Sequence, residues 1–190
     1  ESDGYKVDDG GRITGGPAQY IRDGALANLT DPTVIREHLD RITRAIQSDD
    51  PAQAIGSAKE LIEAAKVVLH EVGCPVDDNW DVPRLVLEAQ IALKVHPTTV
   101  QPGPDGTEAV KKVLGATTSI AIGVAELRNR GYGTGHGAGR RRVGLGSRHA
   151  HLTVGAARLW CEFMLDTLGD QQRPGVKSYE TIPSSSGLLP

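Results

Sequence analysis

Aromatic residues are scarce in this sequence, and it has no long hydrophobic run. Phe, Trp and Tyr together make up 4% of the 190 residues, so the core must be built from Leu, Ile, Val and Ala. That composition suits packed helices better than a β-sandwich. No apolar run approaches ~18 residues, so we expect no membrane span. With no signal-peptide pattern at the start either, the sequence predicts an all-α cytoplasmic protein.

Cysteines are few, and the common catalytic motifs are missing. Cys74 and Cys161 lack the spacing of metal ligands and are interpreted as reduced core residues. The sequence has no phosphate-binding loop of the nucleotide hydrolases, no dinucleotide-binding glycine fingerprint and no nucleophile elbow. We therefore expect no cofactor and no metal. The chain does not begin with Met, which leaves open that an N-terminal module is missing.

Hydrophobic periodicity predicts a bundle of about five helices. Asp31 and Asp50 each precede a proline, as N-cap residues often do, whereas Gly73 has the position of a C-terminal glycine and Ser147 that of an N-cap. The fourth and fifth helices are among the longest and most apolar, so we expect them at the centre. The expected helices cover residues 31–46, 50–72, 81–95, 107–129 and 147–168.

The sequence divides into three regions. Residues 1–29 are rich in Gly and Asp and form either a small hairpin, from residues 5–7 and 12–14, or a disordered extension. Residues 30–169 form the helical domain, and residues 170–190 form an unpacked tail. Within the domain, a loop of roughly 17 residues joins the last two helices. Loops of this length are usually functional or disordered.

Positive charge is concentrated between Leu127 and Cys161. This stretch has no lysine and no acidic residue, and subtracting its seven arginines from the net charge of −3 leaves −10 for the rest of the chain. Segregated positive charge predicts a polyanion partner, and arginine favours bidentate contact with phosphate. The alternative is a solvated basic surface. The arginines are Arg128, Arg130, Arg140, Arg141, Arg142, Arg148 and Arg158.

The arginine-rich stretch contains a loop, residues 131–139, with glycine at every second position and His136 near its middle. Glycines of this kind let backbone N–H groups approach a ligand closely. Neighbouring guanidinium groups favour the neutral form of His136, as a general base requires. In the alternative reading, His136 only caps the final helix.

The other five histidines carry no expected catalytic role. His149 and His151 have poor spacing for a zinc site with His136. The remaining three, His38, His70 and His96, are expected on exposed helix faces or at a helix end.

Two arginines occupy the helix ends that bound the glycine loop. Arg128 ends the fourth helix with Asn129, where the helix dipole alone explains a cation. Arg148 lies in the first turn of the last helix, where the dipole disfavours a cation, so a bound anion would supply the reason. We therefore expect a polyanion with phosphate groups as partner. The expected phosphate-binding residues are Arg130, Gly133, Thr134, Gly135, Gly137, Arg140, Arg141, Arg142, Arg148 and His149.

Three segments of the sequence resemble the C-terminal domain of the abortive infection proteins of bacterial phage defence. They are residues 54–64, residues 125–129 leading to Gly-Thr-Gly-His-Gly at 133–137, and residues 148–157. The resemblance covers about residues 34–168, and the family is similar to the HEPN superfamily of helical bundles. Many of those bundles are metal-independent ribonucleases. Their motif is an arginine, a polar residue and, after a gap of four to six residues, a histidine.

Carried over to this sequence, the resemblance implies Arg128, Asn129 and His136 as the catalytic residues. Seven residues separate Arg128 from His136, whereas five separate Arg130 from His136. Arg130, however, is followed by Gly131 instead of a polar residue, so the choice of arginine stays open.

The resemblance also implies an anti-phage ribonuclease that works as a homodimer. One open alternative is a non-catalytic module that senses RNA or a nucleotide and gates a separate effector. The other is a bundle that serves only as a dimerisation platform.

Overall fold

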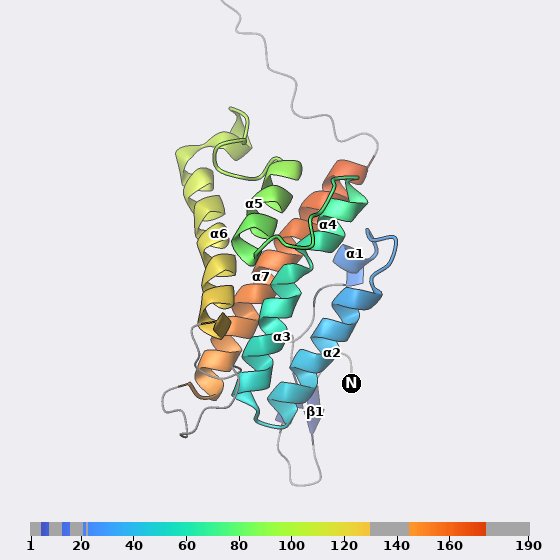
Figure 1. Ribbon diagram of the computed structural model, residues 1–190, viewed down its shortest axis with the longest axis vertical. Helices are drawn as coiled ribbons and strands as arrows, with labels where there is room; N and C mark the ends of the chain where they lie inside the picture. Colours follow the sequence, from blue (N-terminus) through green and yellow to red (C-terminus); the bar gives the residue numbers. More distant parts are fainter. Residues whose placement is uncertain (1–4, 8–12, 16–20, 22, 130–144, 174–190) are drawn as a thin grey trace, which may run out of the picture.

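A computed structural model describes residues 5–7, 13–15, 21, 23–129 and 145–173 of the chain. It is a helical bundle (Figure 1), so the predicted all-α fold is confirmed. Two three-residue strands pair in antiparallel register ahead of the bundle. The strands are β1 (Tyr5–Val7) and β2 (Ile13–Gly15), and the helices are α1 (Asp23–Leu26), α2 (Thr33–Gln47), α3 (Pro51–Glu63), α4 (Ala65–Glu71), α5 (Val82–Ala92), the 3-10 turn η2 (Pro104–Gly106), α6 (Glu108–Asn129) and α7 (Ser147–Gln172).

α3 and α5 begin where an aspartate accepts a backbone hydrogen bond, whereas α2 begins with Pro32 as its N-cap instead of the predicted Asp31. The carboxylate of Asp50 accepts from the backbone N–H of Gln53 at 2.9 Å, and Asp81 accepts from Arg84 at 2.9 Å. Each bond satisfies one of the donors left without a partner in a first helical turn. At the other end of α4, Gly73 has φ +70°, the left-handed geometry expected of a C-terminal glycine.

The second predicted helix is broken into α3 and α4 at Ala64. Backbone bonds there span three residues, from Ala64 N–H to Leu61 O at 3.2 Å and from Val67 N–H to Ala64 O at 2.9 Å. Ala64 and Ala65 are both buried. No glycine or proline marks the break, so residue type does not explain it. α3 contacts α2, α5, α6 and α7, whereas α4 packs mainly against α5 and α7, so the two segments share only part of their packing.

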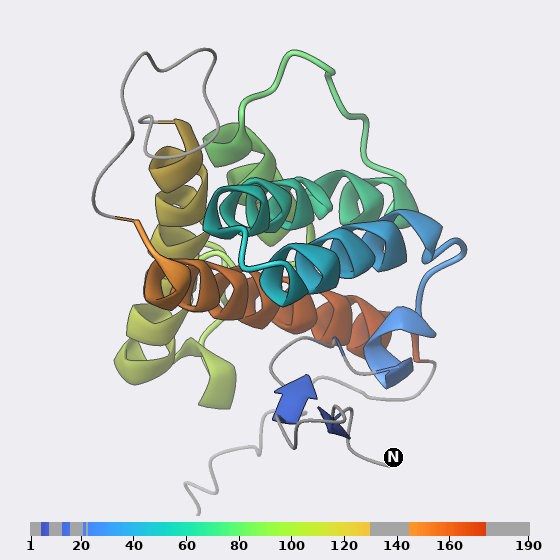
Figure 2. The same cartoon turned by 90° about the horizontal axis from the view of Figure 1, so that it is seen from below.

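The centre of the bundle is formed by α3 and α7. α7 contacts α1, α2, α3, α4 and α6, and α3 contacts α2, α5, α6 and α7. Viewed along the bundle, α7 crosses beneath α2 and α3 while α6 lies to one side (Figure 2). The expectation that the 107–129 helix is central was therefore wrong. α6 has an exposed outer face. Its apolar residues include many Ala and Gly, which need not be buried, so its apolar character did not show a central position.

The bundle core also includes residues ahead of position 30. Ile21, Ala25, Leu26 and Leu29 are buried, and α1 packs against α7. The final helix extends four residues past the predicted end at Leu168, to Gln172. Among the described residues, no helix has both the length and the hydropathy needed to cross a membrane.

Candidate functional site

The ends of three elements meet at one end of the bundle. α6 ends there, α7 begins there, and the turn between α2 and α3 lies beside them (Figures 1 and 2). α6 and α7 pack directly on each other, and α2 also contacts α7. The described residues on either side of positions 130–144 therefore lie at this end of the bundle, which we call the loop end.

Arg128 and Asn129 are the last two residues of α6, and both are exposed. The guanidinium Nη1 of Arg128 lies 3.4 Å from the side-chain Oδ1 of Asn129, to which it donates a long hydrogen bond. Within the described part of the chain, Arg128 forms no ion pair, so its charge is available to a ligand.

The first turn of α7 has no acidic residue, and Gly146 rather than Ser147 is its N-cap. The prediction of Ser147 as the cap was wrong by one position. Backbone N–H groups of this turn therefore have no side-chain cap from the N-cap residue. Arg148 projects from the same turn, is exposed, and has no ion pair among residues 23–129 and 145–173. The helix dipole disfavours a cation in the first turn of a helix. A bound anion would therefore explain the presence of Arg148 there.

His149 stabilises the start of α7. Its backbone N–H donates to Gly146 O at 2.9 Å, and its Nδ1 accepts from the Gly146 N–H at 3.2 Å. Since Nδ1 is the acceptor, the neutral ring carries its proton on Nε2. His149 thus caps the first turn of α7, whereas the alternative reading of His136 as a cap concerns a residue outside the described ranges. The place of His149 among the phosphate-binding residues stays a prediction.

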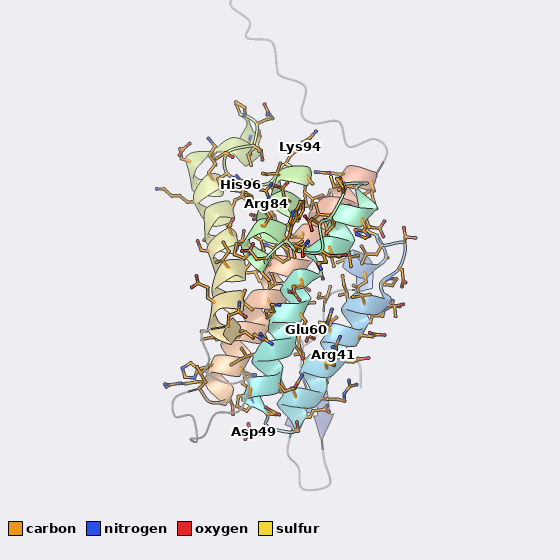
Figure 3. All side chains as sticks on the ribbon, viewed as in Figure 1. Arg41, Asp49, Glu60, Arg84, Lys94 and His96 are labelled. Atoms are coloured by element: carbon orange, nitrogen blue, oxygen red, sulfur yellow. The ribbon has the colours of Figure 1, made fainter. Side chains whose placement is uncertain are left out.

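A contact that the sequence did not suggest joins the α2–α3 turn to α7. The hydroxyl Oγ of Ser147 donates to the carboxylate Oδ1 of Asp49 at 2.6 Å, across 98 positions of sequence. Figure 3 places Asp49 at the loop end, opposite the end that carries Lys94. An aspartate after the end of one helix and a serine at the start of another do not predict such a pairing. Only the folded structure reveals it.

A small open pocket lies beside this contact. It encloses about 170 Å³, including space open to solvent, between the α2–α3 turn and the first turn of α7. Much of this volume is open to solvent, so the closed space lies far below the ~300–1,000 Å³ of usual small-ligand pockets. The pocket is therefore too small to hold a whole nucleotide, and its lining includes Asp49, Asp50, Ser147 and His151.

Most residues of the predicted loop site lie outside the described part of the chain. Of the predicted site residues, the structure places Arg128 and Asn129 at the end of α6 and Arg148 and His149 at the start of α7. Within the described ranges, no cluster of three His, Cys, Asp or Glu side chains has the arrangement of a metal site. The predicted residues outside these ranges are Arg130, Gly133, Thr134, Gly135, His136, Gly137, Arg140, Arg141 and Arg142.

A second group of ionisable residues, which the sequence reading missed, lies between α2 and α3. His38 was expected on an exposed face, but its side chain is only 13% exposed. Its Nδ1 lies 3.0 Å from Arg41 Nη2 and 3.5 Å from Glu60 Oε2, and Arg41 Nη1 lies 3.0 Å from the same carboxylate oxygen. Figure 3 shows Arg41 and Glu60 approaching each other from the two helices.

Burial, followed by the charge of Arg41, lowers the pKa of His38 below its ordinary value, against the opposing pull of Glu60. His38 was missed because periodicity places a polar residue on a helix face without showing which neighbour covers it.

Comparison with known proteins gives one match. No curated protein and no solved structure matches the chain. The family model of the HEPN-like domain Abi_C matches residues 33–168, a range that runs from the start of α2 into the last turns of α7 and includes the loop end. The match covers well over half of the sequence. The chain therefore belongs to this family of HEPN-like domains of abortive infection proteins.

Proposed function

We propose that this domain is a metal-independent endoribonuclease of anti-phage defence, with its active site at the loop end. One observation carries the proposal. Arg128 and Asn129 at the end of α6 and Arg148 at the start of α7 lie at the same end of the bundle, and they bracket the segment that contains His136. In a HEPN-like chain, these are the residue types that an RNA-cleaving site requires.

The proposed reaction is an internal transesterification. His136 takes the proton from a ribose 2′-hydroxyl, and the resulting oxygen attacks the adjacent phosphorus. Arg128 or Arg130 stabilises the negative charge that develops on the non-bridging oxygens. The bond from phosphorus to the 5′-oxygen breaks, and the leaving oxygen takes up a proton from solvent. The products are a 2′,3′-cyclic phosphate and a 5′-hydroxyl, with no change of oxidation state.

The electrostatics of the loop end support an extended RNA strand as substrate. The first turn of α7, which has no acidic residue, and the exposed Arg148 attract phosphate, and the exposed Arg128 adds a second positive charge. The adjoining pocket is too small for an enclosed nucleotide. An open basic surface that follows the sugar-phosphate backbone fits these features better than a closed small-molecule site.

A second function is favoured by the spacing of the motif. Seven residues lie between Arg128 and His136, more than in the ribonuclease motif that the chain resembles. A longer gap fits a loop that binds RNA or a nucleotide and gates a separate effector module without cleaving it. We propose that in either case the domain acts as a homodimer.

The two functions are separated by incubating the purified protein with total RNA in EDTA and identifying the ends of any fragments. The ribonuclease should yield 2′,3′-cyclic phosphate and 5′-hydroxyl ends and leave DNA intact. His136→Ala should lower cleavage by roughly 100-fold or more while RNA binding persists, and Arg128→Ala and Arg130→Ala identify the arginine.

His70→Ala, at an exposed position of α4, is the matched control and should cleave normally. Full cleavage by His136→Ala, or cleavage that requires magnesium, would overturn the mechanism. Binding without cleavage would favour the sensing module.

A further inference from the structure

The turn between α2 and α3 places a non-glycine residue in the left-handed region of backbone space. Asp49 has φ +50°. Its N–H donates to Ile46 O at 3.1 Å, and the N–H of Asp50 donates to Ala45 O at 2.8 Å. This is the pattern in which a helix usually ends on glycine, although aspartate and asparagine also adopt the conformation. Asp49 therefore occupies a place that glycine usually takes.

Lys94 has the same backbone geometry as Asp49 but lies far from the loop end, so this geometry is not specific to the loop end. It follows α5 with φ +58°, and the same pair of backbone bonds closes that helix, from Lys94 N–H to Ile91 O and from Val95 N–H to Gln90 O, each at 2.9 Å. Lys94 lies at the opposite end of the bundle from Asp49 (Figure 3). The two turns thus share one strained conformation, and they differ in what the side chain contacts.

The side chain of Asp49 reaches a different helix. Its carboxylate accepts a hydrogen bond from the Ser147 hydroxyl at 2.6 Å, a short distance of the kind found when an acceptor is charged. Ser147 is the first residue of α7, and Arg148 follows it. Since the N-cap of α7 is a glycine without a side chain, the bond from Asp49 supplies a side-chain restraint on this turn from outside the helix.

We propose that Asp49 is a positioning residue for phosphate binding. Its carboxylate holds Ser147 and thereby fixes the first turn of α7, so that Arg148 and the N–H groups of that turn face the RNA backbone together. This inference rests on the proposed function, because it concerns the same RNA surface. It accounts for a strained aspartate where glycine is the usual residue.

The sign of the effect on RNA affinity makes the proposal testable. A carboxylate beside a polyanion site repels phosphate, so its removal should strengthen RNA binding if charge is its only influence. Positioning predicts the opposite, because the loss of the bond to Ser147 frees the turn that carries Arg148. Asparagine at position 49 separates the two effects, since it keeps an oxygen acceptor and tolerates the left-handed conformation but carries no charge.

The experiment measures binding of a fluorescein-labelled 2′-O-methyl RNA, which cannot be cleaved by the proposed reaction, together with amide hydrogen exchange of the RNA-free protein. Asp49→Gly and Ser147→Ala should each weaken binding by about tenfold, the scale of one charge-assisted hydrogen bond. Each should also speed exchange in the first turn of α7. Asp49→Asn should bind at least as tightly as the wild type.

Two controls complete the test. Lys94→Gly relieves the same backbone strain at the far end and should leave both readouts unchanged. In an Arg148→Ala background, Asp49→Gly should add little further loss of affinity, because both changes remove the same contact.

Binding by Asp49→Gly that equals or exceeds the wild type would overturn the proposal, as would unchanged exchange in both Asp49→Gly and Ser147→Ala. A wild type that binds no RNA would instead overturn the proposed function, and the exchange measurement would still decide whether Asp49 restrains α7.

Discussion

His38 lies at the interface of α2 and α3, which we call the seam, and its protonated form is unfavourable there. Burial and the neighbouring Arg41 guanidinium lower its pKa, and Glu60 and Glu37 oppose them only in part. The unfolded chain therefore binds a proton at this histidine at a higher pH than the folded chain does. By linkage, neutral His38 adds to the free energy of unfolding above the ordinary histidine pKa of 6.5. This contribution is lost as the pH falls through the lower pKa that His38 has in the folded protein.

We accordingly predict that the free energy of unfolding falls as the pH is lowered below about 6.5, the ordinary value for histidine. Urea unfolding at pH 7 and at pH 5 should show a smaller fall for His38→Gln than for the wild type. His70→Gln, at an exposed position, should retain the wild-type pH dependence. An equal fall in wild type and His38→Gln would show that the seam does not contribute to acid sensitivity.

At the scale of elements, α1 packs on α7 through a very close approach at Gly169. A Cβ atom added there would lie 2.1 Å from Nδ2 and 2.5 Å from Cγ of Asn28, far inside van der Waals contact. Gly169 is buried, and Asn28 belongs to the connection that follows α1. The missing side chain at Gly169 therefore makes room for the Asn28 side chain beside α7.

We predict that Gly169→Ala lowers the free energy of unfolding by about 1 kcal/mol, the low end of the usual cost of overpacking, because the obstacle is the end of the Asn28 side chain. Gly123→Ala is the matched control, because nothing lies within 4 Å of a Cβ on that exposed helical glycine. It should raise stability by about 0.5–1 kcal/mol through its helix propensity. In an Asn28→Ala background, Gly169→Ala should no longer destabilise the protein. Persistent destabilisation there would mean that Asn28 is not the obstacle.

The sequence predicts the start or end of a helix where nearby residues determine it, and fails where tertiary packing determines it. The starts of α3 and α5 follow from an aspartate that caps its own helix, and the end of α4 follows from Gly73, so all were predictable. The break at Ala64 was not, because both sides of it are good helix formers and only tertiary packing separates them. The packing of α1 was missed for a similar reason, since four residues are too few to show a helical period.

The same distinction applies to the candidate site. Charge segregation and helix-end position drew attention to Arg128 and Arg148, and the family resemblance added Asn129, whose role stays a prediction. The pairing of Asp49 with Ser147 and the seam around His38 join residues from different helices, so no local pattern reveals them.

On the scale of the whole molecule, α7 carries exposed apolar side chains that bear on the proposed homodimer. Leu152 and Leu159 are 72% and 51% exposed, and helical periodicity places them on one face with Gly155 between them. An antiparallel copy related by a two-fold axis would bury the leucines of both chains against each other.

We predict that the protein elutes at twice its chain mass in size-exclusion chromatography with light scattering, and that Leu152→Glu or Leu159→Glu yields monomers. Val34→Glu, on an exposed apolar position of α2, should leave the dimer intact. A monomeric wild type at micromolar concentration would exclude this assembly, as would a dimer that is insensitive to both leucine changes.

The segregation of charge over the whole chain gives the last prediction. If several arginines contact phosphate, RNA affinity should fall by orders of magnitude between about 50 and 200 mM salt. Replacement of Arg140, Arg141 and Arg142 together by alanine should weaken binding and flatten the dependence on salt by a slope of up to about 3. An affinity that does not respond to salt would show that the arginine-rich stretch is not the binding surface.

The length of α7 has a practical consequence for such measurements. Its 26 residues form a rod of about 39 Å, with Arg148 near one tip and the attachment of α1 near the other. An anchor on a biosensor surface placed at the α1 tip would hold the molecule upright and leave the basic tip in solution. Two dyes, one at each end of α7, would report bending of this helix, because a straight helix keeps the distance between the dyes constant when RNA binds.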